Sequence, residues 1–456
     1  MLKIKRFSGF QKFIPFLDVQ DKIQILKKRF FATDLGKIYR AIPFNEIIKK
    51  LKLKHNEKGP ESLFSPRGKI ALEILKAYTG FSDRKLSQYI RGNIDAQIFC
   101  DIYFDDKTID FDYKLISKIR VEISKKLDIP ELQKILASYW SPYINNKNIL
   151  LMDATCYESY IRYPTDQKLL YEGVEWLNFH LKRITKTLKI KRPRTKYSEI
   201  KQVYQIYSKK KKRRKSERKR ITRRLINLLS KLLIEYENLL ATEALTLNPN
   251  FKARKNTIKE VLSQQEKLFK GEKVEERIVS IDKNYLRPIL RGKEKKPVEF
   301  GAKVHSIQIE GINFIEHITF SSFNESTRLE SSIAYSKALL GEEPKFLGGD
   351  KIYPTNKNRK LCTKKNILTN FKPKGRSCKN KKAKEYISSY ISKKRSTILE
   401  GSFGTEKEHY GDKRIKARLK TTEIYQIYVK IHTKNLLKIG RRISWNLKNH
   451  PQQEVA

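Results

Sequence analysis

Three acidic residues stand where the sequence could place metal-dependent chemistry. Asp153 ends the apolar run "NILLM", Asp350 ends the short run "KFLGG", and Glu400 lies in the helical segment "ILEGSFG". An aspartate after an apolar run is commonly a turn residue or a helix cap. The alternative is that the fold gathers the three carboxylates, because carboxylate oxygens are the ligands that Mg²⁺ prefers.

Gathered acids would support a reaction on phosphodiesters. Two Mg²⁺ ions about 4 Å apart can activate a water or a 3′-hydroxyl and stabilise the leaving oxygen, and Mn²⁺ is expected to substitute for them. Inside so basic a chain, we expect the acids to keep low pKa values and to stay ionised. Spacing alone does not single out this triplet, because the chain contains 49 acidic residues.

The charge of the chain indicates a polyanionic partner. The 456 residues include 99 Lys and Arg against 49 Asp and Glu, which gives a formal net charge of +50. Such an excess is typical of nucleic-acid binding, and an anionic membrane surface is the alternative. No apolar stretch approaches the ~18 residues that a membrane span needs, so we expect no membrane association. The four cysteines lack metal-binding spacing, which argues against a zinc site and fits a reducing cytoplasm.

The elements around the acids are helical in the first half of the chain and mixed in the second. "SPRGKIALEILKAYTG" has Pro66 near a helix start and Gly80 after its end, and Ser82 is a candidate N-cap of the next helix. This pair predicts either a helix-turn-helix or a helical hairpin that only packs. Residues 299–320 predict a β-hairpin around a Glu-Gly turn, and helical periodicity returns from about 384 to 443.

A basic run lies between these regions. Residues 209–224 carry almost unbroken positive charge with one acid among them, and an amphipathic leucine pattern follows them. A charge run can be a solvated face or a flexible tail. In so basic a chain we expect DNA phosphate contacts, which give affinity and salt dependence rather than sequence choice. The expected contacts are Lys209, Lys210, Lys211, Lys212, Arg213, Arg214 and Lys215.

A second basic group follows the third acid. On a helix, Glu400, Lys407 and Arg414 are spaced seven residues apart and share one face. Gly411 could break this stripe before Arg414.

Five blocks of the sequence occur in an order that is typical of one family. They are "DATCYESYIRYPTD", "LRPILRGKEKKPVEFGAKV", "GINFIEHITFSSFNESTRL", "GGDKIYPTNKNRKL" and "LEGSFGTEKEHYGDKRIKARLKTTE". Together they resemble a DDE transposase of a bacterial insertion sequence, and "ALEILKAYTGFSDRKLSQYI" is similar to the helical N-terminal domain of that group. The resemblance implies an α/β RNase H-like catalytic core, with a mixed sheet and flanking helices, plus an all-α N-terminal domain and a basic helical insertion.

The resemblance also implies roles for individual residues. The implied catalytic residues and Mg²⁺ ligands are Asp153, Asp350 and Glu400. The family carries a Tyr-x2-Arg-x3-Glu-x6-Lys signature, in which Lys407 matches the lysine that contacts the transposon end. The arginine position falls on Ser396, with Arg395 one residue early as the candidate DNA contact, and the tyrosine position falls on Lys393. Asp166 is expected to be a loop residue or a cap.

We therefore expect a transposase that binds the terminal inverted repeats of its element and catalyses Mg²⁺-dependent cleavage and strand transfer on double-stranded DNA. A homodimer in the active complex and a bacterial, nucleoid-associated cytoplasmic location are expected with it. The expected parts are a helical DNA-binding domain (1–147), a catalytic domain (148–165 and 277–445), a basic helical insertion (166–276) and a C-terminal tail (446–456). The alternatives are a non-catalytic transposase-derived DNA-binding protein and an RNase H-like nuclease without strand transfer.

Overall fold

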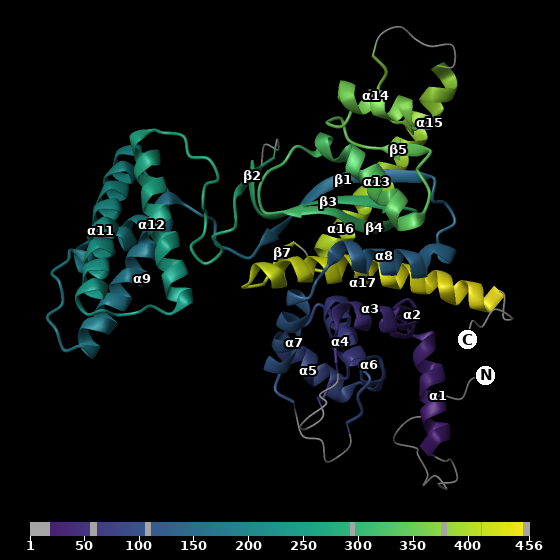
Figure 1. The fold of residues 1–456 in the computed structure, drawn as a ribbon, viewed down its shortest axis with the longest axis horizontal. Coiled ribbons are helices and arrows are strands. Elements are labelled where there is room, and N and C mark those ends of the chain that lie inside the picture. Colours follow the sequence, from purple (N-terminus) through teal and green to yellow (C-terminus); the bar gives the residue numbers. More distant parts are fainter. Residues whose placement is uncertain are drawn as a thin grey trace.

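A mixed sheet forms the centre of the second half of the chain (Figure 1). The computed structural model describes residues 19–54, 62–104, 111–291, 297–374, 381–411 and 413–449, so that Cys378 lies outside the described residues. The strands are β1 (Ile149–Ser159), β2 (Pro288–Leu290), β3 (Val298–Ile309), β4 (Ile312–Thr319), β5 (Phe346–Gly348), β6 (Leu368–Thr369) and β7 (Arg414–Ile415). β1 is central, with β3 antiparallel on one side and β5 parallel on the other.

Both faces of β1 are buried because apolar side chains alternate along it. Ile149 and Leu151 face one helical layer, whereas Leu150 and Met152 belong to the large core on the other face. A strand covered on both sides shows a continuous apolar run rather than an alternating one, which is the pattern of "ILLM".

The predicted hairpin is confirmed. β3 and β4 pair antiparallel up to Ile309 and Ile312, and the two turn residues, Glu310 and Gly311, both have positive φ, at 48° and 80°. This is the backbone of a two-residue type I′ hairpin turn. Arg442 donates a hydrogen bond of 2.9 Å to the carbonyl of Glu310 and so holds its left-handed conformation.

Helices cover both faces of the sheet. They are η3 (Glu325–Arg328), α13 (Leu329–Leu340), α14 (Asn356–Lys364), α15 (Lys381–Lys394), a π-helix (Arg395–Leu399), α16 (Glu400–Glu408) and α17 (Lys420–Asn449). α17 continues to Asn449 and therefore extends beyond the predicted start of the tail at residue 446.

The N-terminal helices lie beneath α17, except for α8 (Ile129–Trp140), which packs against α13 and β4 (Figure 1). They are α1 (Val19–Ala32), α2 (Asp34–Arg40), α3 (Phe44–Leu51), α4 (Pro66–Thr79), α5 (Asp83–Gly92), α6 (Ile94–Phe99), α7 (Lys114–Lys125), α8 (Ile129–Trp140) and η2 (Ser141–Tyr143). The predicted Pro66 start, the left-handed Gly80 end and the Ser82 cap are confirmed. Their apolar residues join those of the sheet in one continuous core, in which Trp140 lies against Phe314 of β4.

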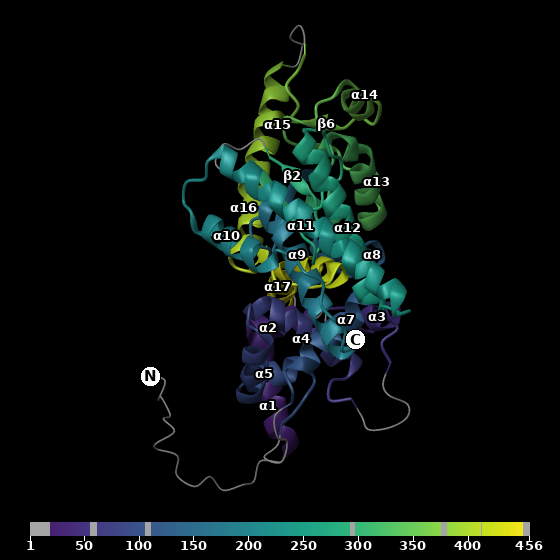
Figure 2. The same ribbon diagram turned by 90° about the vertical axis from the view of Figure 1, so that its left-hand side faces the viewer.

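The segment between β1 and β2 forms a separate helical unit, set to one side of the sheet (Figures 1 and 2). Its helices are α9 (Asp166–Thr187), α10 (Tyr197–Lys209), α11 (Lys215–Thr242) and α12 (Pro249–Lys270). It has its own hydrophobic core, which includes the predicted leucines of α11: Leu225, Leu228, Leu229, Leu232 and Leu233. Asp166 is the first residue of α9 and pairs with Arg277, so it ties the two ends of the unit together.

Candidate active site

The sheet brings two of the three acids to neighbouring positions. Asp153 lies in the middle of β1, and Asp350 follows β5, the parallel neighbour of β1. The register pairs Leu151 with Gly348, so each aspartate lies two residues beyond the same pair. The two carboxylates are therefore presented at the same level of the sheet.

Glu400 approaches the two aspartates from the helical layer that covers this face of the sheet. Leu151 and Asp153 share one face of β1, and Leu151 packs against apolar side chains of α15 and α16. The helical layer comes close because β5 ends in a glycine: a Cβ on Gly348 would lie only 2.7 Å from Cγ2 of Ile391. Glu400 is the first residue of α16 and follows the segment in contact with the sheet.

One guanidinium, that of Arg395, pairs with all three acids. Its Nη1 lies 2.8 Å from Oδ2 of Asp153, and its Nη2 lies 3.0 Å from Oε1 of Glu400. The same Nη2 lies 3.8 Å from Oδ1 of Asp350. The structure thus gathers the three predicted acids around a single internal cation.

A π-helical turn explains how Arg395 comes to face Glu400. The turn spans Arg395–Leu399, and the amide of Glu400 donates its hydrogen bond to the carbonyl of Arg395. A π-turn joins residue i to residue i+5, one residue more than an α-helix, and such turns are frequent at functional sites. The family signature has three residues between its arginine and its glutamate, whereas this sequence has one more. The π-turn accommodates that additional residue. Ser396 and Lys393, which occupy the signature positions by simple counting, are exposed.

Burial dominates the electrostatics of the first acid. Desolvation raises the pKa of Asp153 to about 6, although the Arg395 guanidinium and the Ala154 amide lower it, and the carboxylates of Glu325 and Asp350 raise it further. The expectation of a low pKa is therefore wrong for Asp153, because the basic surroundings do not offset the loss of water. The group is still ionised at neutral pH.

The donor set fits a divalent metal ion. The three acids supply hard oxygen donors, and all three already face one positive charge. Within the described ranges, with the guanidinium between the carboxylates, no group of three or more His, Cys, Asp or Glu side chains is placed to hold one metal ion. A bound metal would replace Arg395 as the partner of Asp153. The ligand roles of the three acids stay a prediction.

Lys407 lies on the same face of the sheet as the acids. Its ammonium donates a hydrogen bond of 2.6 Å to the hydroxyl of Thr155. Thr155 is two residues beyond Asp153 on β1, so the two side chains share a face of the strand. The lysine is half-buried and lies 5.8 Å from the ring centroid of Tyr157.

A buried carboxylate that the sequence did not single out, Glu406, fixes the helix that carries Glu400. It is 0% exposed and accepts hydrogen bonds from Asn313 (2.8 Å), from Lys434 (2.5 Å) and from the hydroxyl of Tyr157. These partners come from β4, α17 and β1, so one side chain joins α16 to three other elements. In the sequence this glutamate looks like its exposed neighbours, and only the tertiary fold reveals its burial.

The remaining predicted DNA contacts lie away from the acids. The prediction that Arg414 shares a helical face with Glu400 and Lys407 is wrong. The helix α16 ends at Glu408, and Gly411 has a φ of +68°. Arg414 is the first residue of β7. The glycine turn ends the helix, and the chain then pairs with the end of β1. The basic residues 209–215 are exposed at the junction of α10 and α11 (Figure 2), and their contact with DNA stays a prediction.

Two protein-family models match the chain. One, described as a transposase DDE domain, matches residues 347–437, and the other, described as a transposase domain (DUF772), matches residues 24–122. Together the two matches support a DDE transposase of an insertion sequence. The first match contains Asp350, Glu400 and Lys407, whereas the second covers the N-terminal helices from within α1 into α7.

The DDE match confirms the expected fold class. A DDE domain implies an RNase H-like fold, and the chain has the expected mixed sheet with flanking helices. Transposases of this kind generally use divalent metal ions and act on DNA. No curated protein and no solved structure matches the chain. Among the helices of the described ranges, none has both the length and the apolar character needed to cross a bilayer.

Proposed function

We propose that this transposase binds the terminal inverted repeats of its own insertion sequence, cleaves DNA there and joins the exposed 3′ ends to target DNA. The observation that carries the proposal is the convergence of Asp153, Asp350 and Glu400 on one guanidinium, at distances of 2.8 to 3.8 Å. Stability alone does not explain this gathering of like charges, since the Asp350 carboxylate raises the pKa of Asp153.

The three acids would hold two Mg²⁺ ions, for which Mn²⁺ can substitute. When bound, the ions would activate the attacking water or 3′-hydroxyl and stabilise the leaving oxygen. Asp153 would be the fixed ligand, since it lies on the central strand, whereas Asp350 and Glu400 are half-exposed, at 51% and 50%, and can adjust.

Two basic residues would position the DNA. Arg395, whose carboxylate partners would hold the metal ions, would contact a phosphate next to the bond that is cut. Lys407, which donates to Thr155, lies on the same face of the sheet and contacts the backbone of the transposon end. Because two transposon ends must be joined to one target, we propose a homodimer as the active complex. The proposed setting is the nucleoid of a bacterial cytoplasm.

A joining assay tests the proposed function. The protein is incubated with labelled DNA of the element end, a plasmid target and Mg²⁺, and wild type is compared with Asp153→Ala, Asp350→Ala and Glu400→Ala. Glu408→Ala is the matched control, because Glu408 is an exposed carboxylate of the same helix that pairs with Lys413. Joined products should form with wild type and with the control and should be lost in the three acid variants.

The same assay separates the alternatives. Cleavage without joined products would indicate an RNase H-like nuclease that lacks strand transfer. Binding of the labelled DNA without cleavage would indicate a non-catalytic DNA-binding protein and would overturn the proposal.

A further inference from the structure

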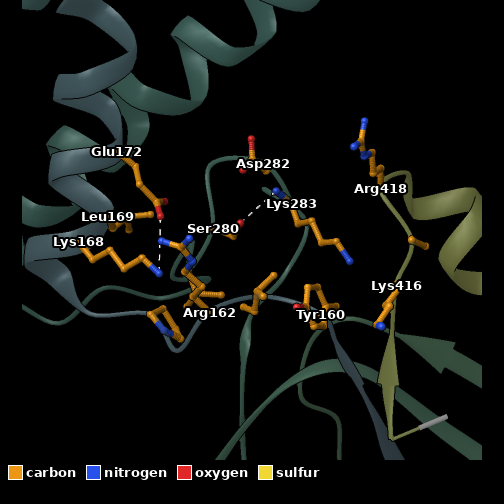
Figure 3. A pocket seen from close by; sticks show the side chains of 14 residues that line it. Tyr160, Arg162, Lys168, Leu169, Glu172, Ser280, Asp282, Lys283, Lys416 and Arg418 are labelled. Carbon is orange, nitrogen blue, oxygen red and sulfur yellow. Dashed lines mark hydrogen bonds and ion pairs between the residues drawn. The ribbon is translucent and has the colours of Figure 1, made fainter. Parts of the chain in front are cut away.

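A cleft of about 800 Å³ lies where the helical insertion joins the catalytic sheet (Figure 3). Its walls come from the chain after β1, the start of α9, the segment 279–283 that returns from the insertion, and the segment after β7. None of the three acids lines it. The cleft is therefore a site separate from the candidate active site.

Three cations in this cleft keep their charge available. Arg162, Lys416 and Arg418 are exposed, and within the described ranges none forms an ion pair within 4 Å, although the charge of Arg162 acts on the Glu172 carboxyl. The other charged lining residues are paired: Lys168 with Glu172, Lys283 with Glu423 and Asp282 with Arg254. The cleft thus presents a net charge of about +3 to a ligand, and its chemistry suits phosphate groups.

Exposed aromatic surface accompanies this charge. The side chain of Tyr160 is 57% exposed and lines the cleft, with the ammonium of Lys416 5.6 Å from its ring centroid (Figure 3). Its backbone is fixed, because the Tyr160 amide donates a hydrogen bond of 3.0 Å to the carbonyl of Ile415. Tyrosine, lysine and arginine side chains all form hydrogen bonds to the phosphates and sugars of DNA.

Two chain segments lead from the acids to the cleft. β1 carries Asp153 in its middle and ends just before Tyr160, and seven residues of twisted strand span about 20 Å. The second segment is α16, which begins at Glu400 and leads into β7, where Arg414 pairs with Glu158 of β1 (Figure 1). Both segments therefore run in the same direction, with Lys407 between the acids and the cleft.

We propose that this cleft binds the sugar–phosphate backbone of DNA about six base pairs from the phosphate that is cut, a proposal that rests on the proposed function. The spacing follows from the separation of about 20 Å and a rise of about 3.4 Å per base pair. The duplex runs across the sheet from the three acids, passes Lys407 and reaches the cleft. There the helical insertion contacts it on the side away from the acids.

The salt dependence of DNA binding tests the cleft directly. The triple variant Arg162→Gln, Lys416→Gln, Arg418→Gln removes three phosphate contacts, so the slope of log affinity against log salt should become shallower by about 2.7, since each contact contributes about 0.9. At 0.1 M salt this corresponds to an affinity about eightfold lower per lost contact.

The matched control removes the same charge outside the cleft. Lys252, Lys267 and Lys270 are exposed on α12 and do not line the cleft, and their triple change to Gln should alter the slope by less than about 1. Equal slopes in the two triple variants would overturn the proposal. Fluorescence anisotropy with labelled element-end duplex measures both variants under identical conditions.

A crosslinking arm tests the position. Tyr160 is replaced by a photoreactive phenylalanine analogue, and the crosslinked base is mapped on a duplex that extends beyond the cut. Crosslinks about five to seven base pairs from the cut are expected. Crosslinks next to the cut, or none, would contradict the proposed path.

The outcomes separate the cleft from the proposed function. If wild type joins DNA and the cleft variant keeps the wild-type slope, only the cleft proposal fails. If wild type binds without cleaving and the cleft variant has the shallower salt slope, the cleft binds DNA but the proposed function, and with it the spacing from a cut, fails. If wild type does not bind DNA at all, both proposals fail.

Discussion

Replacing Asp153 by Asn should stabilise the metal-free protein at neutral pH. Burial raises the pKa of the Asp153 carboxyl from 3.8 to about 6, which means that folding disfavours its charged form. At about 1.4 kcal/mol per pKa unit, the ionised carboxylate costs the folded state about 3 kcal/mol. An amide of the same shape carries no charge and avoids this cost.

The pH dependence has a definite sign. Above pH 6 the carboxylate is ionised in both the folded and the unfolded chain, so the full cost of about 3 kcal/mol applies. As the pH falls from 6 towards 3.8, the folded state takes up its proton first and wild type recovers its stability. The advantage of Asp153→Asn should therefore be largest at pH 7 to 8 and should vanish near pH 4.

Hydrogen exchange of peptides that cover β1 measures this difference, because it reports local opening free energy in a chain too large for a single two-state transition. Asp350→Asn is the matched control, since that side chain is 51% exposed and its change should alter protection by no more than about 0.5 kcal/mol. Added Mg²⁺ should protect wild type and leave Asp153→Asn unchanged. Equal protection of wild type and Asp153→Asn at pH 8 without metal would refute the reasoning.

Three further outcomes follow from the same contacts. Arg395→Gln should destabilise the metal-free protein and raise its affinity for divalent ions, because it removes the internal cation that pairs with the acids; metal titration by calorimetry measures this, and Lys393→Gln, an exposed change two residues earlier, should do neither. Glu406→Gln leaves the ammonium of Lys434 buried without its charged partner and should lower the local opening free energy of α16, measured by hydrogen exchange, by about 3 kcal/mol, whereas Glu408→Gln should be neutral. Changing Lys211, Lys212, Arg213 and Arg214 to Gln should weaken DNA binding equally on specific and random duplexes, with a shallower salt slope; a loss confined to element-end DNA would contradict a purely electrostatic role.

Local sequence signals predicted the elements whose formation depends on neighbouring residues. Pro66, Gly80 and Ser82 mark helix ends through their own backbone and side-chain chemistry, and the structure confirms all three. The Glu-Gly turn likewise predicted the hairpin.

Features that depend on long-range packing were beyond the sequence. The π-turn at Arg395 has no local signature, and it makes sense only once Asp153 and Glu400 are seen on either side of the guanidinium. The raised pKa of Asp153 arises from burial that charge counting does not reveal. The burial of Glu406 is likewise fixed by three elements distant in sequence.

The predicted helical face through Glu400, Lys407 and Arg414 was wrong for a related reason. Its sevenfold spacing through Arg414 was consistent with a helix, but the chain leaves the helix after Glu408 to pair with the end of β1. A strand of two residues gives no periodicity to detect.

The central claim is that Asp153, Asp350 and Glu400 hold the catalytic metal ions, and a change of ligand chemistry at one of them tests it most directly. Asp350→Cys places a soft thiolate where the side chain is half-exposed, so the fold should tolerate it. Joining of element-end DNA should be lost in Mg²⁺ and partly restored in Mn²⁺, while wild type joins in both. Undiminished joining by Asp350→Cys in Mg²⁺ would contradict the account, because Asp350 would then not be a ligand.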